Sequence, residues 1–97
     1  MIRAIPTDDK QTVSKVFGRA TYFALSRGAG AELEFLEGTS NAEHGAGTGA
    51  AALLAGKGVT EVLGAEFGPK ANEALMGAGI AITIVKAGTS LAEALKR

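Results

Sequence analysis

The sequence lacks cysteine and tryptophan, and it has one histidine and two prolines. Without cysteine the chain can form no disulfide, no thiolate metal site, no cysteine nucleophile and no iron–sulfur ligation by protein thiolates. No window approaches the roughly 18 consecutive apolar residues that span a membrane. The first ten residues also lack the apolar stretch of a signal peptide, so we expect a cytoplasmic location.

An excess charge of either sign is also missing, because ten Lys and Arg balance ten Asp and Glu. This balance gives no general attraction to nucleic acid or to an anionic membrane, and we expect neither as a partner. The length of 97 residues and the 46% hydrophobic share favour one folded domain over residues 1–97. The 14 glycines show no period of three, which excludes a collagen-like chain.

The first part of the chain predicts three strands. Strand-like runs cover 2–6 and 22–25, and each is followed by turn residues. From 31 to 35 polar and apolar residues alternate, which places Leu33 and Phe35 on one face. That pattern is typical of a half-exposed edge strand. The turn before it is short, so it should pair with the second strand in antiparallel fashion.

The second part alternates helices with strands, in the order helix 48–57, strand 61–67, helix from Pro69, strand 80–85 and a short helix after Ser90. The run 80–85 is apolar and β-branched, a pattern of strands buried on both faces. Met76 is expected in the core, and Ser90 with Glu93 forms a capping box. Alternating strands and helices indicate parallel strands with right-handed crossovers, hence an α/β fold with a mixed five-stranded sheet covered by helices.

Four stretches follow one another along the chain: AIPTDD, VFGRATYFAL, HGAGTGAAALLAGKGV and FGPKANEALMGAGI. Together they resemble the dinitrogenase iron–molybdenum cofactor biosynthesis family of NifX, NafY and NifB C-terminal-like accessory domains, and the resemblance covers residues 4 to about 84. The resemblance implies a ribonuclease H-like three-layer α/β/α sandwich, with sheet order 3-2-1-4-5 and strand 2 antiparallel. It also implies a function, which is to bind or carry an iron–sulfur or iron–molybdenum type cofactor, or a precursor, during metallocluster assembly, with a cluster-assembly protein as partner.

His44 is the candidate metal ligand. Neutral imidazole is the commonest protein ligand for metals, and no thiolate competes with it here. One histidine cannot form an ordinary zinc site, which needs three or four ligands, but it could contact a preassembled cluster that carries its own sulfides. The resemblance also points to this loop for cluster contact. A solvent-exposed histidine with no ligand is the alternative.

A glycine run, with Gly45, Gly47 and Gly49, follows His44 at the start of a predicted helix. Free N–H groups and the helix dipole at such a place favour an anion, and an anionic cluster would use them. The run also fits a dinucleotide fingerprint that ends at Ala52, but no clear ribose-binding acid follows. A flexible start of the helix with close helix–sheet packing is the simpler structural explanation.

Two more residues are expected at the same end of the sheet. Arg19 could face an anionic ligand or form a surface ion pair, and Phe17 before it is assigned to the core. Thr7 follows the first strand, and open α/β sheets bind ligands in the loops beyond their strand carboxyl ends. Asp8 and Asp9 indicate a turn rather than a nuclease metal site, because no partner carboxylate is evident.

The sequence therefore favours a small non-enzymatic domain that binds a metallocluster through Thr7, Arg19, His44 and the glycine run. No catalytic triad or acid–base pair is visible in the sequence. Two alternatives stay open. One is an anion or nucleotide binder that uses the loop 45–49, and the other is a structural or regulatory domain that contacts another protein through its acidic edge strand without a cofactor.

Overall fold

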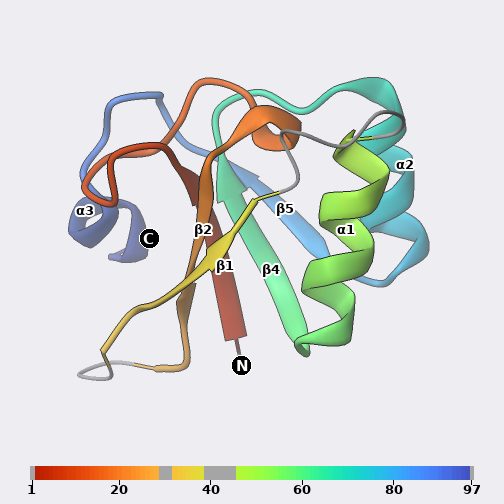
Figure 1. Cartoon of the computed structure of the whole chain (residues 1–97), viewed down its shortest axis with the longest axis horizontal. Coiled ribbons are helices and arrows are strands. Elements are labelled where there is room, and N and C mark those ends of the chain that lie inside the picture. The colour runs from red at the N-terminus through yellow and green to blue at the C-terminus, as the bar shows by residue number, and fades with distance from the viewer. Residues whose placement is uncertain (1, 29–31, 39–45, 97) are drawn as a thin grey trace.

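The computed structural model describes residues 2–28, 32–38 and 46–96, and all the predicted elements are present. Figure 1 shows them. They are β1 (Ile2–Thr7), β2 (Tyr22–Ser26), β3 (Glu34–Glu37), α1 (Ala46–Gly56), β4 (Val59–Gly64), α2 (Pro69–Gly77), β5 (Ala81–Ile84) and α3 (Leu91–Leu95). The short 3-10 helix η1 (Phe17–Arg19) was not predicted. The largest shifts from the predicted bounds are in β3, which begins three residues and ends two residues later, and in β4, which begins two residues and ends three residues earlier. None of the described helices is long and apolar enough to cross a membrane.

The five strands form one mixed sheet in the order β3-β2-β1-β4-β5. β2 is antiparallel to both of its neighbours, whereas β1, β4 and β5 are parallel. At the centre of the sheet Ala4 of β1 pairs with Leu25 of β2 and with Val62 of β4. The strand order and directions implied by the family resemblance are therefore confirmed.

Helices cover both faces of the sheet and create two hydrophobic cores. α1 and α2 lie together on one face, and α3 lies on the other (Figure 1). The first core contains Phe17, Leu54 and Leu75, and the smaller second core contains Leu63 and Leu91. Each fully buried side chain of this size contributes about 1.5–3 kcal/mol. The architecture is thus three layers, with the larger core under α1 and α2.

Local sequence signals set the helix ends. Gly58 has φ +80 just after α1, a backbone conformation that glycine adopts without strain. Pro69 occupies the first turn of α2, where its missing N–H is not needed. The Glu93 N–H donates to Ser90 Oγ over 3.1 Å, so the predicted cap of α3 is confirmed.

Two burial predictions are wrong. The strand 80–85 was expected to be covered on both faces, but β5 is an edge strand and its Ile84 is 63% exposed. Met76 was expected in the core and is 68% exposed. It directly follows buried Leu75, and adjacent helix positions differ by about 100° around the axis, so Met76 points away from the core.

Gly38 offers a stability test. A Cβ at this position would overlap the Ala20 carbonyl oxygen, while the Gly38 N–H donates to Thr21 O over 2.7 Å. We expect Gly38→Ala to lower the unfolding free energy by about 1–3 kcal/mol, because the backbone must shift. Urea unfolding would measure the change.

Gly56→Ala is the matched control. No atom lies within 4 Å of a Cβ built at Gly56, so this variant should be neutral or more stable by up to about 1 kcal/mol. Equal effects of the two substitutions would contradict the close contact at Gly38.

Candidate functional site

The carboxyl ends of the three parallel strands β1, β4 and β5 lie at one end of the sheet, called here the carboxyl end. In Figure 1 this is the upper end, where η1 and the first turns of α1 and α2 also lie. Helix first turns carry N–H groups without intrahelical partners, and the helix dipole is positive there. This carboxyl end therefore joins the loop after β1, η1 and two helix starts in one region.

Thr7 lies beneath the tight turn that follows β1. Its side chain is buried; its hydroxyl donates to Asp9 Oδ1 over 3.3 Å and accepts from the Lys10 N–H over 3.0 Å. Asp9 Oδ1 also accepts from the N–H groups of Gln11 and Thr12 at 2.9 and 2.8 Å. These bonds hold Lys10 at φ +63, which is uncommon for a residue other than glycine. Thr7 therefore shapes the turn, and its predicted contact with a ligand stays a prediction.

The two aspartates behave as turn residues. Asp8 Oδ1 accepts from the Thr21 N–H and hydroxyl at 2.8 and 3.0 Å, which ties the β1 turn to the start of β2. Hydrogen bonds from the Thr12 and Gln11 N–H groups lower the pKa of Asp9 from its ordinary 3.8 to about 2. Within the described part of the chain, no three His, Cys, Asp or Glu residues are grouped so that they could hold a metal ion.

Phe17 anchors η1 to the sheet. Its ring centroid lies 5.3 Å from that of Phe23 on β2 and 5.1 Å from that of Phe67, which follows β4. The Phe17 N–H also donates to Glu66 O over 2.9 Å. A Cβ at Gly64 would come within 2.9 Å of Phe67, so glycine makes room for this ring. The assignment of Phe17 to the core is confirmed.

Arg19 ends η1 with an exposed side chain, and this side chain makes no hydrogen bond or ion pair with the described residues. η1 packs against α1, whose first turn contains Gly47 and Gly49. The structure therefore brings Arg19 and these two glycines to the same end of the molecule. His44 and Gly45 lie outside the described residues, and their roles stay predictions.

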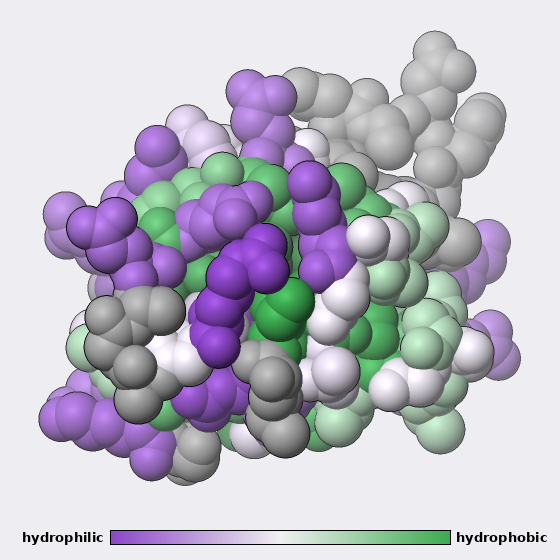
Figure 2. All heavy atoms as spheres, turned by 90° about the horizontal axis from the view of Figure 1, so that it is seen from below, coloured by the Kyte–Doolittle hydropathy of each residue, from purple (hydrophilic) through white to green (hydrophobic). Residues whose placement is uncertain are grey.

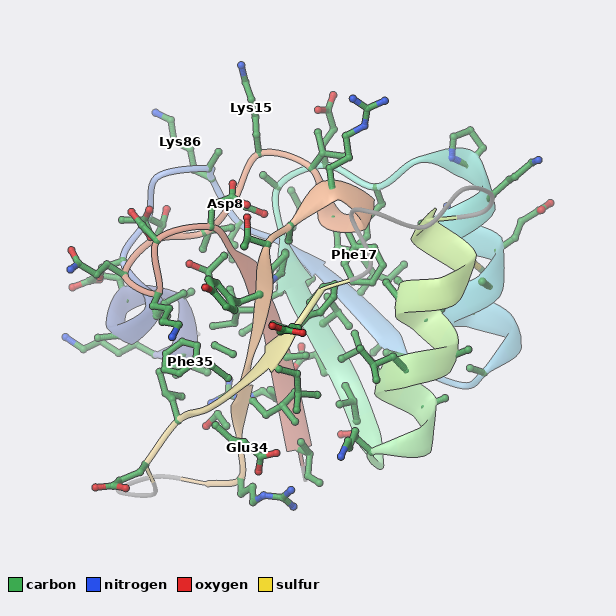
Figure 3. The ribbon with its side chains drawn as sticks, viewed as in Figure 1. Asp8, Lys15, Phe17, Glu34, Phe35 and Lys86 are labelled. Carbon is green, nitrogen blue, oxygen red and sulfur yellow. The ribbon has the colours of Figure 1, made fainter. Side chains whose placement is uncertain are left out.

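The sequence analysis missed two lysines at this end. Lys15 and Lys86 both point outward from the carboxyl end in Figure 3, one from the loop after β1 and the other from just after β5. Lys70 adds a third exposed ammonium in the first turn of α2. No ion pair engages these three in the described part of the chain. The position of Lys15 and Lys86 beyond the carboxyl end of a parallel strand was the signal that could have found these two.

The opposite end of the molecule has a different character. Figure 2 views that end and shows pale and green residues over the helices, with hydrophilic side chains gathered on the other side. α1 and α2 end there in small exposed residues, apart from Lys57. The exposed small residues are Ala55, Gly56, Gly58, Gly77, Ala78 and Gly79. Lys57 is thus the one exposed cationic group among these described helix-end residues, whereas several lie at the carboxyl end.

The lowered pKa of Asp9 predicts how stability depends on pH. A carboxyl whose folded pKa lies below its unfolded value stabilises the fold fully above the unfolded pKa. This contribution should be lost as the pH falls from about 4 to about 2. Asp9→Asn should flatten the fall of unfolding free energy in this window, measured by urea unfolding at each pH. An NMR titration that placed the folded Asp9 pKa near 3.8 would contradict the turn geometry.

Comparison with known proteins agrees with this architecture. The apo form of the orange protein from Desulfovibrio gigas superposes with a TM-score of 0.90 and 31% identity, covering 99% of this chain and 84% of that chain. A candidate NifB protein from Thermotoga gives a TM-score of 0.80 and 32% identity, covering 98% and 84% of the two chains. The protein PH0822 superposes with a TM-score of 0.79 and 26% identity, covering 99% of this chain and 87% of that chain.

No curated protein matches the chain significantly. The model of the family described as "Dinitrogenase iron-molybdenum cofactor", in contrast, matches residues 1–97, the whole chain. The chain therefore belongs to the dinitrogenase iron–molybdenum cofactor family.

Proposed function

We propose that this domain holds an anionic iron–sulfur or iron–molybdenum type cluster, or a precursor of one, and passes it to a cluster-assembly protein. Membership of a family associated with metallocluster biosynthesis supports the class of cargo. The domain acts by holding and shielding the cluster, without catalysis. The cluster is cargo that the domain binds for a time and then releases.

The distribution of charge at the carboxyl end carries the proposal. Arg19, Lys15, Lys70 and Lys86 are exposed there and make no ion pair among the described residues. Three acidic residues, Asp8, Asp9 and Glu66, lie at the same end, and backbone N–H groups already hydrogen-bond the carboxylates of the two aspartates. The cationic side chains, together with the helix starts, are therefore available to an anion.

The donor set fits a cluster that brings its own ligands. The chain has no cysteine, and the described residues contain no group of metal-ligating side chains. A metal–sulfur cluster is already bridged by sulfide, so the protein needs to supply charge, N–H donors and few direct ligands. His44 would supply the imidazole ligand, Gly45, Gly47 and Gly49 the N–H donors, and Arg19 the neutralising charge.

Thr7 would act at this site through the turn it supports. Its hydroxyl is engaged with Asp9 and the Lys10 N–H, so it holds the loop after β1 in position. Placement of that loop decides where Lys15 and η1 lie relative to the sheet. The role of Thr7 in binding is then to keep the site assembled.

Anaerobic reconstitution with ferric and ferrous iron and sulfide tests the proposal. The full chain should develop the visible absorbance of an iron–sulfur cluster, and His44→Ala should weaken this band because a direct ligand is lost. Arg19→Gln should lower the affinity for the cluster about three- to tenfold, as expected for the loss of one charge-assisted contact.

Lys57→Gln is the matched control, because it removes one exposed positive charge at the opposite end of α1. This variant should bind the cluster like the wild type. Equal binding by His44→Ala and the wild type would remove His44 from the site. A wild-type chain that binds no cluster, but binds a nucleotide with micromolar affinity in calorimetric titration, would overturn the proposal in favour of a nucleotide site at the glycine run.

A further inference from the structure

The two edges of the sheet differ in charge. β3 forms one edge and carries Glu34 and Glu37, whereas β5 forms the other and the run 80–85 contains no charged residue. Charged side chains on an edge strand oppose pairing with another sheet, and a bare edge permits it. β5 is therefore the edge at which strand pairing between molecules meets the least opposition.

The backbone of β5 has hydrogen-bonding groups that face outward. The Val85 N–H donates to Gly64 O over 2.8 Å, so the backbone of Val85 faces β4. In a strand this direction alternates with every residue, which places the N–H and C=O groups of Ile82 and Ile84 on the open side. The edge thus offers two donors and two acceptors spaced two residues apart.

The side chains of β5 are also partly exposed to solvent. Ile82 packs against the first core as a partly buried residue, and Ile84 lies on the same face of the sheet with 63% of its area exposed. Among the described residues, only Ile84 and Met76 are large hydrophobic residues with such exposure. Thr83 lies on the other face, where its hydroxyl hydrogen-bonds with Glu61 Oε2 of β4 over 2.5 Å.

We propose that two copies of this chain associate through β5, paired antiparallel about a two-fold axis at Thr83, to form one continuous ten-stranded sheet. In this register Ile82 of each copy pairs with Ile84 of the other, and all the outward N–H and C=O groups of both residues are used. Each exposed Ile84 is then covered by Ile82 of the other copy. Thr83 faces its own counterpart on the opposite sheet face, a favourable cross-strand pair.

Pairing of β5 with β5 of a second copy is more favourable than the pairings that involve β3, because it brings no like charges opposite each other. Lys86 is the first charged residue after β5, and in this register it lies opposite Ile80 of the other copy rather than the other Lys86. Pairing of β3 with β3 would bring glutamates together. Pairing of β3 with β5 would set Glu34 and Glu37 beside an apolar strand and would generate an open chain of molecules. The closed dimer through β5 avoids all of these costs.

Sedimentation equilibrium of the full chain over a range of concentrations tests the dimer. The wild type should show a monomer–dimer equilibrium, and Ile84→Lys should raise the dissociation constant at least about tenfold, because a lysine would replace an isoleucine that only the dimer buries. Ala55→Lys is the matched control, since it adds the same charge at an exposed position of α1 and should leave the constant unchanged.

Ile84→Pro separates edge pairing from general hydrophobic association. The Ile84 N–H faces outward, so proline removes a donor of the proposed interface and leaves the hydrogen bonds to β4 intact. Far-UV circular dichroism should show a folded chain, and sedimentation should show a monomer. If Ile84→Pro fails to fold, Ile84→Lys still decides the question.

Amide hydrogen exchange identifies the interface itself. The Ile82 and Ile84 N–H groups should become protected as the concentration rises through the dissociation constant. A wild-type chain that stays monomeric at NMR concentrations would overturn the proposal. So would a dimer in which these two amides exchange rapidly, or one that Ile84→Lys leaves as stable as before. These outcomes are independent of whether the carboxyl end binds a cluster.

Discussion

Phe17 is the contact on which the carboxyl end of the fold depends. Its ring lies against Phe23 and Phe67, and its N–H donates to Glu66 O, so one residue joins η1 to β2 and to the loop between β4 and α2. The same residue forms part of the larger core with α1. Arg19 lies two residues further on in η1, so the contacts of Phe17 also fix the position of the Arg19 backbone. The same side chain therefore belongs to the hydrophobic core and holds the elements of the proposed binding end in place.

Much of the fold could be predicted, because local patterns coincide with the final environment. Alternation near Phe35 indicated an edge strand, and Gly58 and Ser90 marked helix ends that the structure confirms. The strand order came from the family resemblance, since no local pattern contains it. The burial of β5 was mispredicted for the same reason. The run 80–85 has the apolar composition of a central strand, but the sheet order places β5 at an edge and leaves Ile84 exposed.

The candidate site was only partly predictable. Thr7 and Arg19 were predicted at this end because each lies next to a strand at a defined place; the structure places both there, and their contact with a ligand stays a prediction. Phe17 was correctly assigned to the core. Lys15 and Lys86 were missed, because 70 residues of sequence separate them and only the parallel arrangement of β1 and β5 brings them to one end. A surface made of distant charges has no local signature in a single sequence.

The central position of β1 has a consequence for how the chain reaches its fold. β1 pairs with β2 after the connection 8–21, but its other neighbour is β4, which lies much further along the chain, where Ile2 meets Val59. Such contacts between distant residues are slow to form, because a long loop must close first. During synthesis the antiparallel ribbon of β1, β2 and β3 can assemble early, while one side of β1 stays open until β4 has left the ribosome. The middle of the finished sheet is thus an exposed edge for much of the time the chain is being made.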